Sequence, residues 1–363
     1  MSIKEYILAI NPGSTSTKVA IFKGAQCIKQ NNLSHSPQEV NKYEKITDQF
    51  EFRMNIILRW LAQEGIDEHS LIAVVGRGGL LRPMPGGTYI VTDKMIEDLK
   101  IGVQGEHASN LGGIIAKGIA QKHGILSFIV DPVAVDEFED IARISGLPEL
   151  PRKSLVHALN IKAVSLRVAK KLGKSLDSIN LVVAHLGGGI SIAPVKRGKI
   201  IDVNNANDGG PFSPERAGSV PVGDLVKLAY SGKYNQKQLK KKTVGEAGLV
   251  GYLGTNDARE VEKKIQNGDT QALMVFEAMC YQISKEICAM AAVLYGEVEV
   301  VILTGGLAYS KRLVNLITDR VKFIAPIEIV AGEDEMLSLV EGAYRVISGE
   351  EKAKIYEDEV YVK

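Results

Sequence analysis

The feature that most constrains this chain is a strand pattern that occurs twice. Each copy is typical of three short strands joined first by a polar or glycine-rich turn and then by a tight turn. The expected strands lie at 6–10, 18–22 and 25–28, and again at 181–185, 190–195 and 199–203. Two unrelated β-meanders would share this pattern by chance. The copies lie near the starts of the two halves, however, as expected for a duplicated domain.

After each meander, helical periodicity alternates with short apolar runs of the kind found in buried strands. The expected strands of these regions lie at 72–75, 125–130, 298–303 and 324–330. The expected helices lie at 53–65, 109–121, 154–172, 270–295 and about 334–348. This pattern indicates an α/β chain with a mixed sheet flanked by helices in each half.

The length of 363 residues suggests two domains. We expect residues 1–150, joined by a C-terminal helix at about 334–363, to form the first domain. Residues 151–333 then form the second, which carries most of the nucleotide site. Since no low-complexity linker separates the halves, we expect them to meet across an interdomain cleft. The 44 basic and 43 acidic residues create no global field that would attract nucleic acid or an anionic membrane.

The cysteines and the apolar runs indicate a cellular compartment. Cys27, Cys280 and Cys288 are odd in number and form no CxxC pair, which favours a reducing environment. The apolar run at 6–10 is too short for a signal peptide. The uncharged run at 287–295 is about half a membrane span. We therefore expect a cytoplasmic protein without a membrane segment.

The turn at 11–18 is a candidate phosphate-binding loop. Its sequence, Asn-Pro-Gly-Ser-Thr-Ser-Thr-Lys, offers hydroxyls, backbone amides and an ammonium group to an anion. It does not match GxxxxGK[ST], and no helix pattern follows it, so a helix-terminus phosphate site is excluded. An ordinary solvated hairpin turn is the alternative.

Two further glycine-rich turns are candidate ligand loops. The segment 185–191 contains three consecutive glycines, which are conformationally costly and are best explained by close approach of a ligand to the backbone. A flexible hairpin is again the alternative. The segment 302–307 ends a strand with two glycines and opens a helix, which lets a nucleotide lie at the mouth of a sheet.

Together these loops resemble those of the actin-like ATPase superfamily, which includes sugar kinases, heat-shock chaperones and acetate kinases. Further segments narrow the resemblance to the acetate and butyrate kinase family along nearly the whole chain, with most similarity to its butyrate kinase branch. In chain order the matching segments are 11–18, 75–79, 129–131, 156–158, 185–191, 254–262, 303–306 and 332–335. The resemblance implies two duplicated actin-like, or ribonuclease H-like, domains.

The resemblance implies reversible transfer of the γ-phosphoryl group of ATP to a carboxylate, with Mg²⁺ as cofactor. A carboxylate needs no general base, so the enzyme must offset charge repulsion and align two anions. Arg77 is the candidate to bind the acid and the phosphoryl group, because its planar fork keeps its charge. Asp131 is the candidate to orient Arg77 or a metal-bound water. His157 and His185 are candidate donors to the phosphoryl oxygens.

The resemblance also implies nucleotide and metal contacts. Asn11 and Glu335 are candidates for the Mg²⁺ shell, acting through water. The implied phosphate contacts are Ser14, Ser16, Lys18, Gly187, Gly188 and Gly189. The implied adenosine contacts are Asp257, Arg259, Gly305 and Gly306. For Asp257 and Arg259 the alternative is a helix N-cap and an exposed charge.

The chain departs from the acetate kinase pattern at two catalytic positions. Where acetate kinases have His-Asn-Pro-Ala-Asn-Leu, this chain has Glu106 and His107 in the first two places, so the family's histidine is not carried over. A second arginine, found in Thr-Arg-Ser-Gly-Asp, is absent from the segment 220–224. Our hypothesis is that Arg216 takes its place.

Other departures bear on the size of the acid. Gly79, Gly105 and Val156 stand where acetate kinases have larger residues, and with Pro214 they are the expected acyl contacts. Each additional buried CH₂ contributes about 0.8 kcal/mol, so two favour butyrate over acetate by roughly tenfold. We therefore expect butyrate or isobutyrate as the acceptor, with acetate or propionate as the alternative.

Two other functions have to be weighed. A sugar kinase of the same superfamily needs a carboxylate base, and Asp131 could serve as one. A non-catalytic ATP-driven switch needs an additional peptide-binding region, for which 363 residues leave no room. The expected partners are a short-chain carboxylic acid and its acyl phosphate, with no nucleic acid or membrane. The resemblance implies a homo-oligomer.

Overall fold

The computed structural model describes residues 5–361, which form two compact units. The N-terminal unit contains the residues up to Asp136 and those from Asp334 onward, and the C-terminal unit is Glu137–Glu333. The segment 137–150, which the sequence pattern places in the first domain, contacts the C-terminal unit. There the Glu137 carboxylate pairs with Lys162, with 2.6 Å between the charged atoms.

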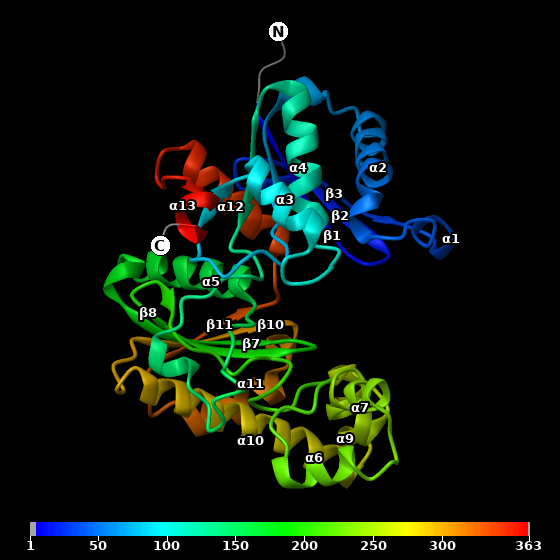
Figure 1. Ribbon diagram of the computed structural model, residues 1–363. Coiled ribbons are helices and arrows are strands. Elements are labelled where there is room, and N and C mark those ends of the chain that lie inside the picture. The colour runs from blue at the N-terminus through cyan, green and yellow to red at the C-terminus, as the bar shows by residue number, and fades with distance from the viewer. Residues whose placement is uncertain (1–4, 362–363) are drawn as a thin grey trace. The chain divides into compact units, whose positions relative to one another are not determined.

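A seven-stranded mixed sheet forms the centre of the N-terminal unit (Figure 1). Its strands are β1 (Tyr6–Pro12), β2 (Ser16–Lys23), β3 (Gln26–Ser34), β4 (Leu71–Arg77), β5 (Thr88–Ile90), β6 (Leu126–Val130) and β12 (Lys354–Ile355). They are arranged in the order β12-β5-β6-β4-β1-β2-β3. Strands β1, β4 and β6 run parallel, whereas β2 is antiparallel to β1 and to β3. All strands expected here from the sequence are present.

Helices cover both faces of this sheet. They are α1 (Pro37–Val40), α2 (Phe50–Gln63), α3 (Asp93–Ile101), α4 (Asn110–His123), α12 (Glu335–Ile347) and α13 (Tyr356–Val360). On one face, Leu8 and Ile10 of β1 belong to a core cluster with Ile57 of α2 and Ile115 of α4. Helix α12 packs against β1, β4 and β6.

Helix α12 confirms the helix expected at about 334–348, but the chain does not continue as a helix to about 363. Helix α12 ends at Ile347, and Gly349 with a φ of +82° turns the chain into β12 and then α13. A residue in the left-handed region just beyond a helix is a common stop signal. The last two residues of the expected helix, 362 and 363, lie outside the described part of the chain.

The C-terminal unit repeats the strand order of the first. Its strands are β7 (Asn180–Leu186), β8 (Ile190–Lys196), β9 (Lys199–Ile200), β10 (Val300–Gly305) and β11 (Ile327–Ala331). The order β11-β10-β7-β8-β9 has the same strand directions as β6-β4-β1-β2-β3. The two meanders therefore occupy equivalent places in two sheets of the same design.

The helices of this unit are α5 (Ala158–Lys171), α6 (Val222–Ala229), α7 (Gln236–Thr243), α8 (Gly248–Leu253), α9 (Ala258–Gln266), α10 (Thr270–Val293) and α11 (Lys311–Val321). Figure 1 shows α5 on one face of the sheet and α10 with α11 on the other. Helix α5 begins four residues after the start of the helix that the sequence predicts at 154–172. His157 has a non-helical ψ of 59° and caps the helix, its carbonyl accepting from the Ile161 amide.

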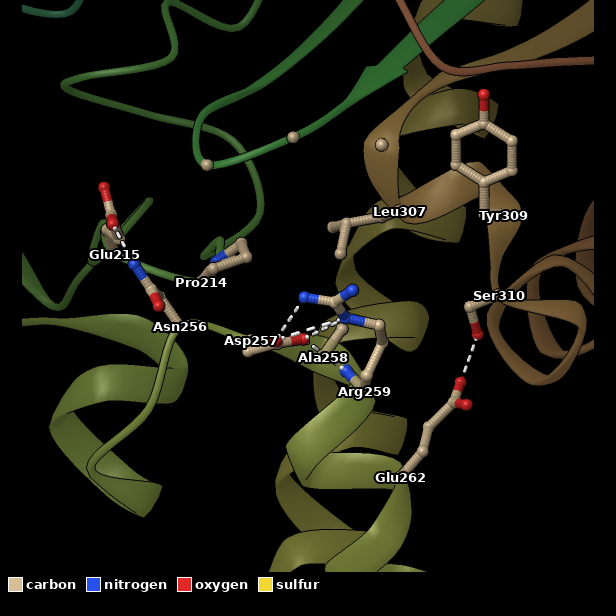
Figure 2. A pocket seen from close by; sticks show the side chains of 13 residues that line it. Pro214, Glu215, Asn256, Asp257, Ala258, Arg259, Glu262, Leu307, Tyr309 and Ser310 are labelled. Carbon is tan, nitrogen blue, oxygen red and sulfur yellow. Dashed lines mark hydrogen bonds and ion pairs between the residues drawn. The ribbon is translucent and has the colours of Figure 1, made fainter.

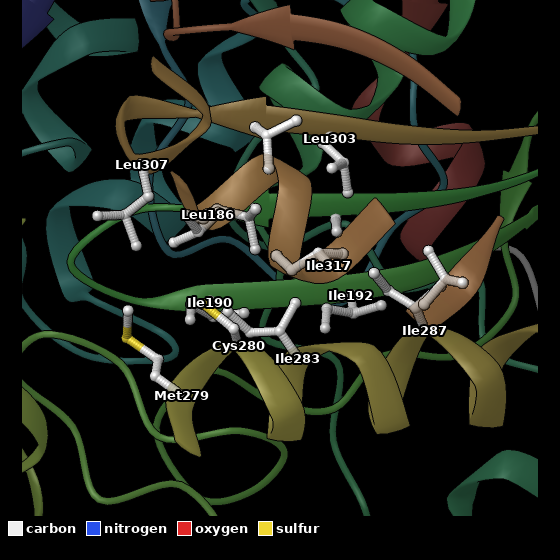
Figure 3. Packing of buried hydrophobic residues seen from close by; sticks show 14 of the residues in the cluster. Leu186, Ile190, Ile192, Met279, Cys280, Ile283, Ile287, Leu303, Leu307 and Ile317 are labelled. Atoms are coloured by element: carbon white, nitrogen blue, oxygen red, sulfur yellow. The ribbon is translucent and has the colours of Figure 1, made fainter. Parts of the chain in front are cut away.

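The core of the C-terminal unit lies between its sheet and α10. Figure 3 shows Cys280, Ile283 and Ile287 of α10 directed toward Ile190 and Ile192 of β8. Their spacing of three and four residues places them on one helical face, and the two isoleucines alternate along one face of the strand. Burial of each large aliphatic side chain contributes about 1.5–3 kcal/mol.

A contact between two glycines fixes the position of β4 in the N-terminal unit. A Cβ atom on Gly76 of β4 would lie 2.1 Å from the carbonyl oxygen of Gly112 in α4. A Cβ atom on Gly112 would lie 2.2 Å from the carbonyl oxygen of Arg77. Helix and strand therefore touch backbone to backbone at the residue before Arg77.

We expect Gly76→Ala to lower the free energy of unfolding by about 1–3 kcal/mol, because a methyl group must displace backbone rather than a flexible side chain. Urea unfolding followed by circular dichroism measures the loss. Gly223→Ala, where a Cβ atom meets nothing within 4 Å, is the control and should change stability by less than about 0.5 kcal/mol. Equal stability of Gly76→Ala and the wild type would contradict the close contact.

Candidate functional site

Three predicted site residues lie at one edge of the N-terminal sheet. Because β1, β4 and β6 are parallel, their carboxyl ends meet at this edge, where α/β proteins commonly bind ligands. Asn11 lies near the end of β1, Arg77 ends β4, and Asp131 directly follows β6. Local strand pairing thus brings together residues that are far apart in the sequence.

The guanidinium group of Arg77 is held from two sides. The side chain is nearly buried, and its Nη1 donates to the carbonyl oxygen of Asp131 at 3.3 Å. Its Nε lies 3.5 Å from Oε1 of Glu335, the first residue of α12. The other carboxylate oxygen of Glu335 accepts from Nδ2 of Asn11 at 2.5 Å. The two candidate metal contacts and the candidate arginine therefore form one cluster.

Asp131 contacts Arg77 through its backbone. Its carboxylate accepts from the Gly87 amide at 2.7 Å, and its φ of +38° is unusual for a residue other than glycine. The carbonyl oxygen of Asp131 faces the guanidinium group of Arg77.

The first hairpin places its polar side chains on opposite faces. Lys18 lies directly across from Asn11, and directly opposed residues of an antiparallel pair share a face. Ser16 is two residues from Lys18 along β2 and shares that face as well. Thr17 points to the other face, where its hydroxyl lies 2.8 Å from Nε2 of the buried His35. Ser14 lies at the exposed tip of the turn.

The pKa of His35 is lowered to about 4, first by burial and then by the charge of Arg53. The unfolded chain takes up this proton near pH 6.5, whereas the folded chain does so only near pH 4. His35 therefore favours folding fully above about pH 6.5, and this contribution is lost as the pH falls toward 4.

We expect His35→Gln to lose less stability than the wild type between pH 7.5 and pH 5, because glutamine binds no proton in this range. The midpoint of urea unfolding at the two pH values measures the difference. His69→Gln, at an exposed site, is the control and should keep the wild-type pH dependence. The same loss in His35→Gln and the wild type would show that His35 is not the group that titrates.

The small residues after Arg77 have a packing explanation. A Cβ atom on Gly79 would lie 2.4 Å from Oδ1 of Asn110, and Gly105 has a φ of +121°, which disfavours any side chain. Asn110 was not among the predicted site residues. Its Oδ1 accepts from the Leu80 amide at 2.9 Å, and its Nδ2 donates to the Gly105 carbonyl at 3.1 Å. The absence of a side chain is therefore explained at Gly79 by close packing against Asn110 and at Gly105 by the backbone angle, and a larger acyl pocket stays a prediction.

His107 also belongs to the surroundings of Arg77. Burial, followed by the charge of Arg77, lowers the pKa of His107. Its Nδ1 is hydrogen-bonded to the Ser109 hydroxyl at 2.8 Å. In the alignment with acetate kinases, the family's histidine falls on Glu106, one residue before His107. For this reason the sequence did not identify His107 as a site residue.

The two candidate histidines of the C-terminal unit form a stacked pair. The rings of His157 and His185 are 4.0 Å apart at their centres and inclined by 13°. Nδ1 of His157 is hydrogen-bonded to the Ser191 hydroxyl, and Nδ1 of His185 to Oδ1 of Asn160, both at 2.8 Å. Nε2 of His185 lies 3.1 Å from the carboxylate of Glu333. Glu333 was not predicted, although it lies in the matched segment 332–335.

His185 is kept neutral. Burial, followed by the nearby His157, lowers its pKa well below the ordinary value. A neutral ring carries a hydrogen on only one nitrogen, so His185 donates to Asn160 or to Glu333 but not to both.

Val156, which precedes His157, is buried with a relative exposure of 5%.

The three glycines of the second hairpin have different surroundings. Gly187 and Gly188 line a pocket, whereas a Cβ atom on Gly189 would lie 2.2 Å from Nη1 of Arg216. The same nitrogen donates to the carbonyl oxygen of Ala206 at 3.2 Å, and burial lowers the pKa of Arg216. Arg216 therefore lies against the glycine loop, which only a residue without a side chain permits.

A pocket of about 720 Å³ lies beside this loop. Figure 2 shows Arg259 projecting into it from the start of α9, with Leu307 and Tyr309 on one side and Asn256 on the other. Such a volume is typical of small-molecule sites. Gly306 and Pro214 also line the pocket. The remaining lining residues are Glu215, Asp257, Ala258, Glu262 and Ser310.

Polar side chains around this pocket are organised in pairs. Asp257 caps α9 and accepts three hydrogen bonds from the Arg259 side chain, which lower the pKa of Asp257 to about 2. Glu262 accepts from the Ser310 hydroxyl. The cap and the exposed charge expected as the alternative for Asp257 and Arg259 are present, and both residues also line the pocket, so their contact with adenosine stays a prediction. Glu262 ends the matched segment 254–262 but was given no role.

The two glycines at the end of β10 have different surroundings. Gly305 has a φ of +86°, and a Cβ atom there would lie 2.4 Å from the carbonyl oxygen of Leu186. Gly306 opens a short 3₁₀ helix and meets nothing within 4 Å, so its backbone faces the pocket. Gly305 is therefore explained by packing, and Gly306 is the member available to a ligand.

Two wider observations concern the whole described chain. Among residues 5–361, no helix combines the length and the apolar character needed to cross a membrane. Cys27 is exposed, Cys288 is half-buried, and Cys280 is buried, which raises its pKa to about 12. All three thiols are free.

Known structures share this fold. An acetate kinase of Porphyromonas gingivalis superposes with a TM-score of 0.78 at 20% identity, covering 94% of this chain and 99% of that one. A propionate kinase of Francisella tularensis gives 0.73 at 18% identity with the same coverage. The predicted fold class, two actin-like α/β domains with mixed sheets, is confirmed.

Sequence comparison defines the family. The model of the acetokinase family matches residues 150–356. A probable butyrate kinase of Clostridium botulinum is 54% identical over 351 residues, 96% of this chain and 99% of the relative. Butyrate kinase 2 of Clostridium acetobutylicum is 55% identical over 355 residues, 98% of this chain and 100% of the relative. The chain belongs to the acetokinase family.

Proposed function

We propose that this protein transfers the γ-phosphoryl group of ATP to the carboxylate of a short-chain fatty acid, butyrate or isobutyrate, and releases ADP and an acyl phosphate. The observation that carries the proposal is the identity of 53–55% to relatives named butyrate kinase over nearly the whole chain. A cytoplasmic location and a homo-oligomeric state, both predicted from the sequence, are part of the proposal.

The chemistry requires no proton transfer. One oxygen of the ionised acid attacks the γ-phosphorus atom, the bond to the β-phosphate oxygen breaks, and ADP leaves with that electron pair. The acceptor is already an anion, so the enzyme needs cations and donors rather than a base. In keeping with this, the Asp131 carboxylate, the candidate base of a sugar kinase, is hydrogen-bonded to the backbone.

In the proposed mechanism, Arg77 receives the carboxylate and the transferred phosphoryl group. The Asp131 carbonyl and Glu335 orient its fork, whose planar geometry suits a carboxylate or a phosphoryl group. His157 and His185 are the proposed donors to phosphoryl oxygens. For His185 this requires that its single hydrogen is on Nε2 and that a phosphoryl oxygen replaces Glu333 as its partner.

The pocket beside the glycine loop is the proposed adenosine site. Gly187, Gly188 and Gly306 offer backbone, and the carboxylates of Glu215 and Glu262 are suitable acceptors for ribose hydroxyls. Arg216 lies directly behind the glycine loop, where its charge attracts phosphate. This arrangement supports its proposed role in place of the arginine missing from the segment 220–224.

Magnesium is part of the proposal. In the part of the chain that the structure describes, no three His, Cys, Asp or Glu side chains are grouped to hold a metal ion. Asn11 and Glu335 supply one amide and one carboxylate, a donor set that suits Mg²⁺ held largely through water and phosphates. When bound, the ion would neutralise phosphate charge.

The acceptor is tested with a panel of linear and branched acids of two to six carbons, supplied with ATP and with hydroxylamine to trap the acyl phosphate as hydroxamate. We expect kcat/KM to peak at four or five carbons, roughly tenfold above acetate, because two more methylenes are buried. Arg77→Ala should abolish the product. A maximum at acetate would contradict the proposed acid, and no hydroxamate from any acid would contradict the reaction.

Arg216→Ala should lower kcat with butyrate by about 10²-fold, because a preorganised donor to the phosphoryl group is lost. Gly189→Ala should act in the same direction, since its methyl group displaces the guanidinium group. Arg312→Ala removes an exposed arginine of α11 and is the control, with turnover unchanged within about twofold. Wild-type turnover in Arg216→Ala would show that this arginine is not the substitute.

A further inference from the structure

Arg53 of α2 lies buried directly behind the first hairpin, and the proposed mechanism gives it no role. Its relative exposure is 1%. The guanidinium group makes hydrogen bonds through all three nitrogens. Its acceptors are the carbonyl oxygens of Gly13 (2.7 Å), Ser14 (3.1 Å) and Ser16 (3.1 Å), the hydroxyl of Thr17 (3.1 Å) and the amide oxygen of Gln49 (3.0 and 2.8 Å).

Every one of these acceptors is neutral. No carboxylate forms an ion pair with Arg53 anywhere between residues 5 and 361. Burial alone lowers the pKa of Arg53 to about 10, so the group stays protonated near neutral pH. An enclosed cation without an anion is costly, and its field is weakly screened by water. Such a charge is useful where the compensating anion is a ligand.

The contacts of Arg53 also determine how the turn presents its amides. Arg53 engages the carbonyl oxygens of Gly13 and Ser14. In a trans peptide the carbonyl group and the following N–H point in opposite directions, and this chain has no cis peptide among the described residues. The N–H groups of Ser14 and Thr15 therefore point away from Arg53. Successive amides with a common direction form a concavity that binds anions.

The rest of the hairpin is arranged to match. Thr17 faces Arg53, whereas Ser16 and Lys18 lie on the opposite face together with Asn11. The carbonyl oxygen of Thr15 accepts from the His35 amide at 2.8 Å. Protein donors thus occupy the carbonyl oxygens of the turn, and the amides of Ser14 and Thr15 and the side chains of Ser16 and Lys18 lie on the side away from Arg53.

We propose that Arg53 is a positioning residue for the polyphosphate of the nucleotide. Its fork draws the carbonyl groups of the turn inward, so that the amides of Ser14 and Thr15 face the phosphates. Its uncompensated charge attracts those phosphates without touching them. The proposal rests on the proposed function only in taking a nucleotide as the ligand.

The test measures binding of the ATP analogue AMPPNP by calorimetry, without any acid. Adenosine, measured by competition, is the ligand without phosphates. We expect Arg53→Gln to raise the Kd of AMPPNP about tenfold and to leave that of adenosine within about twofold. Arg53→Lys keeps the charge but not the fork and should raise the Kd of AMPPNP about threefold.

Ile57→Val is the matched control, because Ile57 is buried one turn further along α2 and belongs to the core cluster on that face. It should loosen the same helix without changing the Kd of AMPPNP more than about twofold. Unchanged AMPPNP binding in Arg53→Gln would overturn the proposal, as would an equal loss in Ile57→Val or for adenosine. If Arg53→Gln does not fold, Arg53→Lys decides by the same criteria.

The proposed reaction and the role of Arg53 can fail separately. A selective loss of AMPPNP binding in the Arg53 variants, with no hydroxamate from any acid, would support the positioning role and refute the proposed acceptor. Hydroxamate formation together with unchanged AMPPNP binding in both variants would support the proposed acceptor and refute the positioning role.

Discussion

Parallel hydrogen bonding among the central strands of each sheet is the interaction on which the rest of the structure depends. The pairing of β1, β4 and β6 brings Asn11, Arg77 and Asp131 to one edge, although 120 residues separate the first from the last. The pairing of β7, β10 and β11 does the same for His185 and Gly305 in the other unit. A shift of register by one residue would turn these side chains to the opposite face.

The charges at these edges follow a common principle. Arg53 and Arg216 are desolvated, and they donate hydrogen bonds to backbone carbonyl, hydroxyl and amide oxygens. Such acceptors fix a guanidinium group without neutralising it, so its charge remains available to an anionic ligand. Arg77 differs, because it pairs with a carboxylate. One oxygen of the Glu335 carboxylate lies near Arg77, and the other accepts a hydrogen bond from Asn11. His185 also differs, because burial lowers its pKa and keeps the ring neutral.

Much of the fold could be predicted because its signals are local. The strands of both meanders and the helices α2, α4, α10 and α12 follow from periodicities of 2 and 3.6 residues. The predictions were wrong where a single backbone angle decides the outcome, as at Gly349 and at His157. Gly79 shows a subtler difference, since its missing side chain is explained by Asn110, which lies 31 residues away in the sequence.

The sequence by itself determined that the chain contains two copies of one strand pattern, and the order of its motifs indicated the acetokinase family. Only the tertiary structure decided which groups hold those motifs in place. Asn11 meets Glu335 across 324 residues, and Arg53 meets Gly13 across 40. Periodicity predicts which face of an element is buried. The partner of a buried polar group depends on packing between distant elements, so no local sequence pattern predicts that partner.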